Sequence, residues 1–177
     1  MNLYFVRHGS AGTPKPHPQE DAKRELDREG RLQCQLIGQL LAALDIRFDE
    51  IVASPFRRAS EAADIIAKRT GFRGQVALAP ALRPDGTYDR FLELLSDMRS
   101  ANSALLVGHN SKLAEFIGRL ISDGTGRARI HLKKGAVAKV VRRRTGATLQ
   151  WCMTPKLLRA YLAEQPSVAP RARSYAR

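Results

Sequence analysis

Three short apolar runs of this 177-residue chain are each followed at once by residues that can bind or attack anions. The runs lie in residues 2–7, 51–53 and 104–107. Continuous apolar runs of this length are typical of strands that are buried on both faces of a parallel sheet. In open α/β sheets the residues past the carboxyl ends of such strands line the crevice where ligands bind. The runs therefore favour an α/β fold and indicate where its functional site lies.

Segments with helical periodicity alternate with these runs. Apolar residues at helical spacing predict a helix over residues 27–44, and Ser54 followed by Pro55 predicts the N-cap and first residue of another helix. We further expect helices over residues 88–98, 112–121 and 155–162, and Asn110 or Ser111 should cap the second of them. Strands are expected over 75–79, 136–141 and 147–152. Residues 10–23 are rich in proline and predict a loop. This order predicts a three-layer α/β sandwich, with a mostly parallel central sheet, helices on both faces and a C-terminal antiparallel strand pair.

The length fits one domain, which we expect to span residues 1–163 and to be followed by a disordered basic tail over 164–177. The first strand starts at once, without a charged leader and a long apolar stretch, and this predicts a cytoplasmic protein with no membrane association. Cys34 and Cys152 lie far apart in apolar-patterned segments. This placement indicates buried free thiols in place of a disulfide or a metal site.

The net charge of +13 is unevenly distributed along the chain. Residues 1–123 hold 17 Lys or Arg against 16 Asp or Glu, whereas residues 124–177 hold 13 against the single Glu164. A solvated strand edge and a disordered tail would account for this basic C-terminal third, and so would an acidic partner protein. Nucleic acid is not favoured, because the charge is not spread over the whole chain.

Arg7-His8-Gly9 follows the first apolar run and is the first candidate site segment. A neutral imidazole is a competent nucleophile toward phosphorus near neutral pH. The glycine allows backbone and ligand to approach closely. A histidine at a strand end can also simply bond a backbone carbonyl, and a lone Arg-His-Gly is a weak pattern.

Two more cations follow the other runs. Arg58 would lie in the first turn of the helix after Ser54, where backbone N–H groups and the helix dipole favour a phosphate. The adjacent Arg57 would point about 100° away around the helix and remain a surface charge. His109 follows the third run and, as imidazolium, could pair with a phosphoryl oxygen. Imidazoles and guanidiniums at three strand ends together suit phosphoryl transfer.

These segments resemble, in the same order, the motifs of the histidine phosphatase superfamily, which has the phosphoglycerate-mutase-like fold. The matching stretches are Arg7-His8-Gly9, Ser54-Pro55-Phe56-Arg57-Arg58-Ala59 and Val107-Gly108-His109-Asn110. The chain is similar in particular to the small SixA-type phosphohistidine phosphatases. Residues 26–30 look like the Leu-Thr-x-Glu-Gly of that branch, and residues 149–155 look like its closing strand.

The resemblance implies that His8 is the phosphorylated nucleophile and that Arg7, Arg58 and His109 form the phosphate pocket, with Ser10 and Asn110 as further substrate-binding residues. It implies neither a metal nor another cofactor, because the cations of the pocket supply the charge neutralisation.

The general acid of larger family members has no clear counterpart, and Asp85 is the nearest candidate. An imidazole leaving group needs an acid less than an alkoxide does, so the resemblance implies phosphohistidine on a protein as the substrate. Two alternatives stay open: a phosphomonoesterase for a small phosphorylated metabolite, and a non-catalytic polyanion-binding module.

Overall fold

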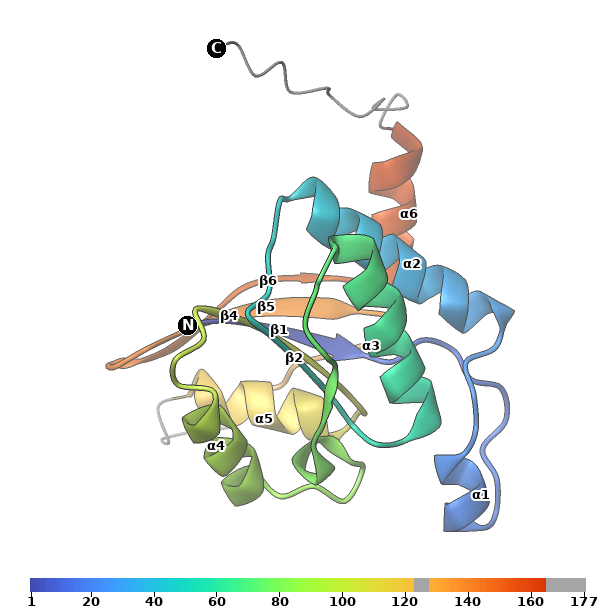
Figure 1. Cartoon of the computed structure of the whole chain (residues 1–177), viewed down its shortest axis with the longest axis horizontal. Helices are drawn as coiled ribbons and strands as arrows, with labels where there is room; N and C mark the ends of the chain where they lie inside the picture. Colours follow the sequence, from blue (N-terminus) through green and yellow to red (C-terminus); the bar gives the residue numbers. More distant parts are fainter. Residues whose placement is uncertain (123–127, 165–177) are drawn as a thin grey trace.

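The computed structural model describes residues 1–122 and 128–164, and Figure 1 shows how their helices and strands are arranged. The strands are β1 (Asn2–Arg7), β2 (Glu50–Ala53), β3 (Ala77–Leu78), β4 (Ser103–Gly108), β5 (Val137–Arg143) and β6 (Gly146–Met153). The helices are α1 (Pro18–Ala22), α2 (Arg28–Ala43), α3 (Arg57–Thr70), α4 (Tyr88–Asp97), α5 (Lys112–Leu120) and α6 (Pro155–Glu164), with a 3-10 turn at Pro80–Leu82.

The strands form one sheet in the order β3-β2-β4-β1-β5-β6. β3, β2, β4 and β1 run parallel to their neighbours, whereas β5 is antiparallel to β1 and β6 is antiparallel to β5. The predicted mostly parallel sheet with a C-terminal antiparallel pair is thereby confirmed. Parallel strands need helical crossovers, and this explains why helices alternate with strands over the first two thirds of the chain.

Helices cover both faces of this sheet and give it two apolar cores. α2, α3 and α6 lie on one face, and α4 and α5 lie on the other (Figure 1). Along β1, Tyr4 and Val6 pack into the first core, while Leu3 and Phe5 pack into the second. Because successive side chains of a strand point to opposite faces, a strand that is covered twice must be apolar throughout.

Several predicted element boundaries are wrong. α3 begins at Arg57, two residues later than expected, and Ser54 does not cap it: Phe56 is at the N-cap position. The predicted strand over 75–79 is reduced to Ala77–Leu78, because this exposed edge segment pairs only with the end of β2. The expected loop over 10–23 contains the short helix α1, which starts at Pro18.

Cys34 is buried, as expected, but Cys152 is only partly buried, and that part of the prediction is wrong. Cys152 lies on β6, an edge strand that receives less cover than the centre of the sheet. α6 extends to Glu164, so the prediction that the tail begins at residue 164 is wrong by one residue. The rest of the predicted tail, from Gln165 onward, and Arg127 lie outside the described residues. No helix in the described ranges is long and apolar enough to cross a membrane.

Candidate active site

The order of the sheet brings the predicted strand-end residues together. β4 lies between β1 and β2, and the register pairs Arg7 with Gly108 and Ala53 with Val107. Backbone hydrogen bonds continue past the strands: the N–H of His8 donates to the Gly108 carbonyl over 3.1 Å, and the N–H of Ser54 donates to the Val107 carbonyl over 2.8 Å. His8, Ser54 and His109 are therefore held at neighbouring positions on one edge of the sheet.

The ring of His8 is buried and oriented by its own neighbours. Its Nδ1 lies 2.7 Å from the carbonyl oxygen of Gly9, so Nδ1 carries the proton and donates. Nε2 then has a lone pair, which accepts a hydrogen bond from Nε of Arg58 at 3.2 Å. The pKa of His8 is lowered to about 3, mainly by burial and in part by the charges of Arg58 and Arg7. The imidazole is therefore neutral near pH 7.

His109 lies next to His8, with 5.0 Å between the ring centroids. Its Nε2 is 2.9 Å from Oγ of Ser54, so the serine that was expected to cap α3 holds this histidine instead. Phe56 packs edge-on against the ring at 5.2 Å. Burial lowers the pKa of His109, and the neighbouring His8 and Arg58 lower it too. His109 is thus neutral near pH 7 by itself, and its protonation beside a phosphoryl group stays a prediction.

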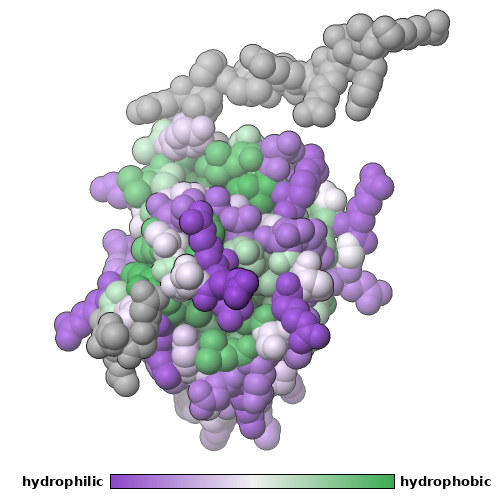
Figure 2. Space-filling model, turned by 90° about the vertical axis from the view of Figure 1, so that its left-hand side faces the viewer, coloured by the Kyte–Doolittle hydropathy of each residue, from purple (hydrophilic) through white to green (hydrophobic). Residues whose placement is uncertain are grey.

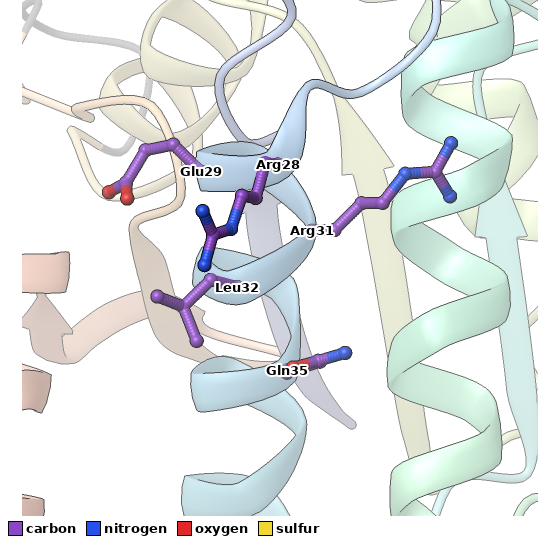
Figure 3. Close-up of a pocket in the computed structure, with 5 residues that line it drawn as sticks. All are labelled: Arg28, Glu29, Arg31, Leu32 and Gln35. Atoms are coloured by element: carbon purple, nitrogen blue, oxygen red, sulfur yellow. The ribbon is translucent and has the colours of Figure 1, made fainter.

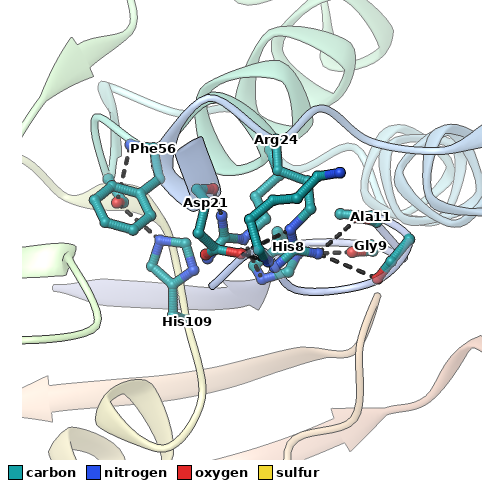
Figure 4. Close-up of polar contacts among 11 residues, drawn as sticks. His8, Gly9, Ala11, Asp21, Arg24, Phe56 and His109 are labelled. Carbon is teal, nitrogen blue, oxygen red and sulfur yellow. Dashed lines mark hydrogen bonds and ion pairs between the residues drawn. The ribbon is translucent and has the colours of Figure 1, made fainter. Parts of the chain in front are cut away.

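Arg58 is buried in the first turn of α3 and makes three polar contacts. Besides its bond to His8, Nη1 donates to the backbone carbonyl of Asp21 over 2.6 Å, and Nη2 lies 3.0 Å from the carboxylate of Asp21. Arg24 donates to the same carboxylate over 2.9 Å and to the Ala11 carbonyl over 2.6 Å. Figure 4 shows Asp21 and Arg24 beside His8, and Phe56 beside His109.

Sequence reasoning missed Asp21 and Arg24. Asp21 lies in the segment over 10–23, which was predicted to be a loop long enough to fold over a site, and Arg24 directly follows that segment. The local signal for a helix start was present, because Pro18 is followed by two acidic residues in the first turn of α1. Nothing local indicated that this carboxylate would meet a guanidinium 37 residues away in the chain.

Arg7 is half-buried and held by the segment before β5. Its Nη1 donates to the Leu132 carbonyl over 2.9 Å, while Nε is buried and has no hydrogen-bond partner among the described residues. The charge of Arg7 lowers the pKa of His8, so the two side chains lie close enough to interact electrostatically. Arg7, His8, Arg58 and His109 thus form one cluster.

The other predicted residues lie around this cluster. The hydroxyl of Ser10 donates to Asp27 over 2.7 Å, and Asn110 is exposed next to His109. Asp85 is 69% exposed in its side chain and pairs with Arg83 at 3.0 Å, and the Arg83 guanidinium lies 5.6 Å from the centre of the Phe56 ring. Arg83 therefore lies over the aromatic ring next to His109, whereas Asp85 contacts Arg83 through its ion pair.

Arg57 is exposed, as expected, but it is not only a solvated charge. Its Nε donates over 2.9 Å to the buried Glu61, which also accepts the backbone N–H of Leu26 over 3.0 Å. Arg57 thus helps to neutralise a buried carboxylate that sequence reasoning did not identify. No group of three His, Cys, Asp or Glu in the described ranges could hold a metal ion.

A separate cavity of about 830 Å³ opens over the outer face of α2 (Figure 3). It is lined by Arg28, Glu29, Arg31, Leu32 and Gln35. Its lining includes both arginines and a glutamate, and it includes none of the candidate site residues. This cavity therefore has neither a nucleophile nor a set of cations that could bind a phosphate without a competing carboxylate.

Comparisons with known proteins agree with this geometry. Residues 3–84 match the family model of the histidine phosphatase superfamily (branch 1). An uncharacterized protein of Picosynechococcus sp. is 35% identical over 140 residues, which cover 77% of this chain and 82% of that protein. Among solved structures, the protein histidine phosphatase SixA complexed with tungstate superposes with a TM-score of 0.78 at 22% identity, covering 89% of this chain and 99% of that one. A phosphoserine phosphatase mutant of Entamoeba histolytica, in complex with phosphoserine, gives a TM-score of 0.67 at 16% identity, covering 89% and 98%.

The fold and these matches define the class of protein first: it is a phosphatase. Its family follows from the family-model match and from the Picosynechococcus relative, most of whose length this chain covers. The chain belongs to the histidine phosphatase superfamily.

Proposed function

We propose that this phosphatase hydrolyses phosphohistidine on a protein through a covalent phosphohistidine on its own His8. The observation that carries the proposal is the state of His8. Its Nδ1 proton is engaged by the Gly9 carbonyl, its Nε2 carries the lone pair and faces the Arg58 guanidinium, and burial keeps the ring neutral. A neutral, oriented imidazole needs no separate base to act as a nucleophile.

In the first step Nε2 of His8 attacks phosphorus in line. A bond from Nε2 to phosphorus forms while the bond from phosphorus to the leaving nitrogen breaks, and that nitrogen keeps the electron pair. Arg7 and Arg58 hold the equatorial oxygens as charge-assisted donors, and His109 donates an N–H or becomes protonated beside the phosphoryl charge. In the second step a water oxygen attacks phosphorus and the bond from phosphorus to Nε2 breaks, with the electron pair returning to Nε2. Inorganic phosphate leaves with the oxygen of the water, whose protons stay on the phosphate or pass to solvent, and neutral His8 is regenerated.

The leaving group is assigned from what surrounds the scissile bond. A guanidinium, that of Arg83, and not a carboxyl group lies against the Phe56 ring, and Asp85 is exposed and paired with Arg83. The Asp21 carboxyl does lie at the site, but it pairs with Arg58 and Arg24. Although burial raises the pKa of Asp21, the hydrogen bond from Arg24 and the charge of Arg58 leave this pKa below its ordinary value, so Asp21 is a carboxylate and not a proton donor. A site without a protonated acid suits an imidazole leaving group better than an alkoxide. The higher TM-score of the protein histidine phosphatase SixA supports the same choice.

The test is to trap the intermediate. After brief exposure of the full chain to a ³²P-phosphohistidine peptide, we expect an acid-labile, alkali-stable label on His8 and release of phosphate. His8→Ala should lose the label and about a thousandfold or more of turnover, because the nucleophile is gone. His131→Ala, an exposed histidine outside the cluster, is the matched control and should keep both. Turnover without a label on His8 would contradict the covalent mechanism.

A further inference from the structure

A cavity of about 430 Å³ adjoins the candidate active site on the side of Arg7. Its cations are Arg7, Lys133, Lys134 and Lys156, and the remaining lining residues are Gln33, Thr154 and Pro155. No carboxylate lines it. The three lysines are exposed, and within the described ranges none of them forms an ion pair. Several uncompensated positive charges therefore converge on one hollow.

The turn that carries Lys133 and Lys134 is fastened to the catalytic strand end. The N–H of Gly135 lies 3.1 Å from both the Arg7 carbonyl and the His8 carbonyl, and the N–H of Arg7 donates to Ala136 over 3.2 Å. Gly135 has a φ of +67°, a conformation that favours glycine and lets the turn close here. The two lysines thus have a defined position relative to His8.

The third lysine comes from the start of α6. Lys156 lies in the first turn of this ten-residue helix, directly after Thr154 and Pro155. The dipole of the helix start adds positive potential to that of the lysines. The cavity therefore receives positive charge from three separate parts of the chain: the end of β1, the turn before β5 and the start of α6.

The nearest carboxylates are already engaged elsewhere. Asp27 accepts hydrogen bonds from Ser10, Gly12 and Gly30, although the charge of Lys134 also contributes to its lowered pKa. Glu29 pairs with Arg159. Neither neutralises the lysines by direct contact, so a ligand carboxylate can pair with them.

We propose that this cavity binds acidic side chains that flank the phosphohistidine of the protein substrate. The inference rests on the proposed function and specifies which phosphoproteins the site prefers. With the phosphoryl group on Arg7, Arg58 and His109, neighbouring residues of a protein surface extend across Arg7 toward the lysines. The hollow is open and rimmed by lysines, unlike the enclosed pockets that select small metabolites.

The experiment compares two phosphohistidine peptides of equal length, one with Asp and Glu flanks and one with Asn and Gln flanks, together with phosphohistidine itself. The full chain is tested beside K133A/K134A/K156A, and beside a control variant R99A/R143A/R144A that removes the same charge from exposed positions elsewhere. We expect the lysine variant to raise KM for the acidic peptide about tenfold with little change in kcat, since exposed charge pairs are individually weak. The control variant should change KM less than about twofold.

A second readout does not depend on phosphohistidine chemistry. An unphosphorylated acidic peptide should inhibit hydrolysis of an aryl phosphate by the wild-type chain, and the lysine variant should lose this inhibition. Hydrolysis of phosphohistidine without any preference for acidic flanks would overturn the subsite alone. Inhibition by acidic peptides without phosphohistidine turnover would overturn the proposed function instead. If both triple variants lost the preference for the acidic peptide equally, the assignment of this cavity to acidic protein segments would be overturned. Stronger inhibition by a small bisphosphate or an oligonucleotide than by the acidic peptide would overturn it as well.

Discussion

At the scale of single residues, two adjacent arginines of α3 have different surroundings. Arg58 is buried against His8 and Asp21, whereas Arg57 is exposed and pairs with Glu61 and Glu25. Successive residues of a helix point about 100° apart, so one side chain enters the site and its neighbour leaves it. This difference allows a paired test in which each arginine is the control for the other.

Arg58→Ala should lower kcat/KM on an aryl phosphate by about a hundredfold or more, because one preorganised donor to the developing charge is removed. Arg57→Ala should change activity by less than about threefold and instead lower the free energy of unfolding, because Glu61 loses an ion-pair partner inside a largely buried environment. Steady-state kinetics and urea unfolding measure the two effects. Equal kinetic losses would mean that Arg58 does not contact the phosphoryl group.

The carboxyl of Asp85 is the remaining candidate for a general acid. We expect Asp85→Asn to lower the rate on a phosphohistidine substrate less than about threefold, since the side chain is exposed and paired with Arg83. Removing an acid in use commonly costs about a hundredfold to ten-thousandfold. Brisk hydrolysis of an unactivated alkyl phosphate that collapses in this variant would favour a phosphomonoesterase with Asp85 as its acid.

At the scale of elements, the segment that contains α1 contacts the site through Asp21. The carboxylate of Asp21 forms an ion pair with Nη2 of Arg58 at 3.0 Å, and this guanidinium is proposed to bind the phosphoryl oxygens. Arg24 ties the same carboxylate to the Ala11 carbonyl near the start of the segment. A phosphoryl group and Asp21 would therefore compete for one guanidinium.

Asp21→Asn should strengthen inhibition by inorganic phosphate about threefold to tenfold, because a competing negative charge is removed. Glu20→Gln, an exposed change of equal charge in the same helix, is the control and should have little effect. The measurement is the inhibition constant on an aryl phosphate. Weaker inhibition in Asp21→Asn would show that Asp21 mainly orients Arg58.

At the scale of the whole molecule, basic side chains collect on the C-terminal elements. The tip of the β5–β6 hairpin carries Arg142, Arg143 and Arg144, and Figure 2, which views the side of the molecule where this tip lies, shows strongly hydrophilic side chains projecting from that face. The lysines beside Arg7 belong to the same basic third of the chain. The predicted basic character thus contributes to at least one hollow next to the site.

Global stability should depend on pH through the two buried histidines. Both have a pKa in the folded state below the ordinary value of 6.5. The contribution of these two histidines to the free energy of unfolding is therefore complete above pH 6.5. It is lost as the pH falls toward their pKa in the folded state, because the unfolded chain then binds protons that the folded chain does not. Each group contributes a slope of up to about 1.4 kcal/mol per pH unit.

We expect the free energy of unfolding to fall between pH 7 and pH 5, as measured by urea denaturation. His8→Gln/His109→Gln, which places neutral side chains at both positions, should remove most of this dependence. An unchanged slope in the double variant would show that other groups bind the protons.

Much of the architecture was predictable because it follows from local pattern. Apolar runs indicated β1, β2 and β4, and helical spacing indicated α2, α4 and α5 within a few residues. The failures lie where a side chain found a distant partner. Ser54 has the sequence context of a helix cap, yet its hydroxyl lies against Nε2 of His109, 55 residues away. Ala77 and Leu78 form only a short edge strand, which pairs with Val52 and Ala53 of β2, and nothing local in the sequence showed where this pairing would stop.

The sequence by itself determined the layered α/β fold and the presence of imidazoles and guanidiniums at its strand ends, because periodicity and strand-end position are local properties. Tertiary structure alone decided which groups meet. It joined Asp21 to Arg58, kept both histidines neutral through burial, and fastened the Lys133–Lys134 turn to the backbone of His8. Protonation states and ligand sites depend on through-space distance and desolvation, and no spacing along the chain specifies either.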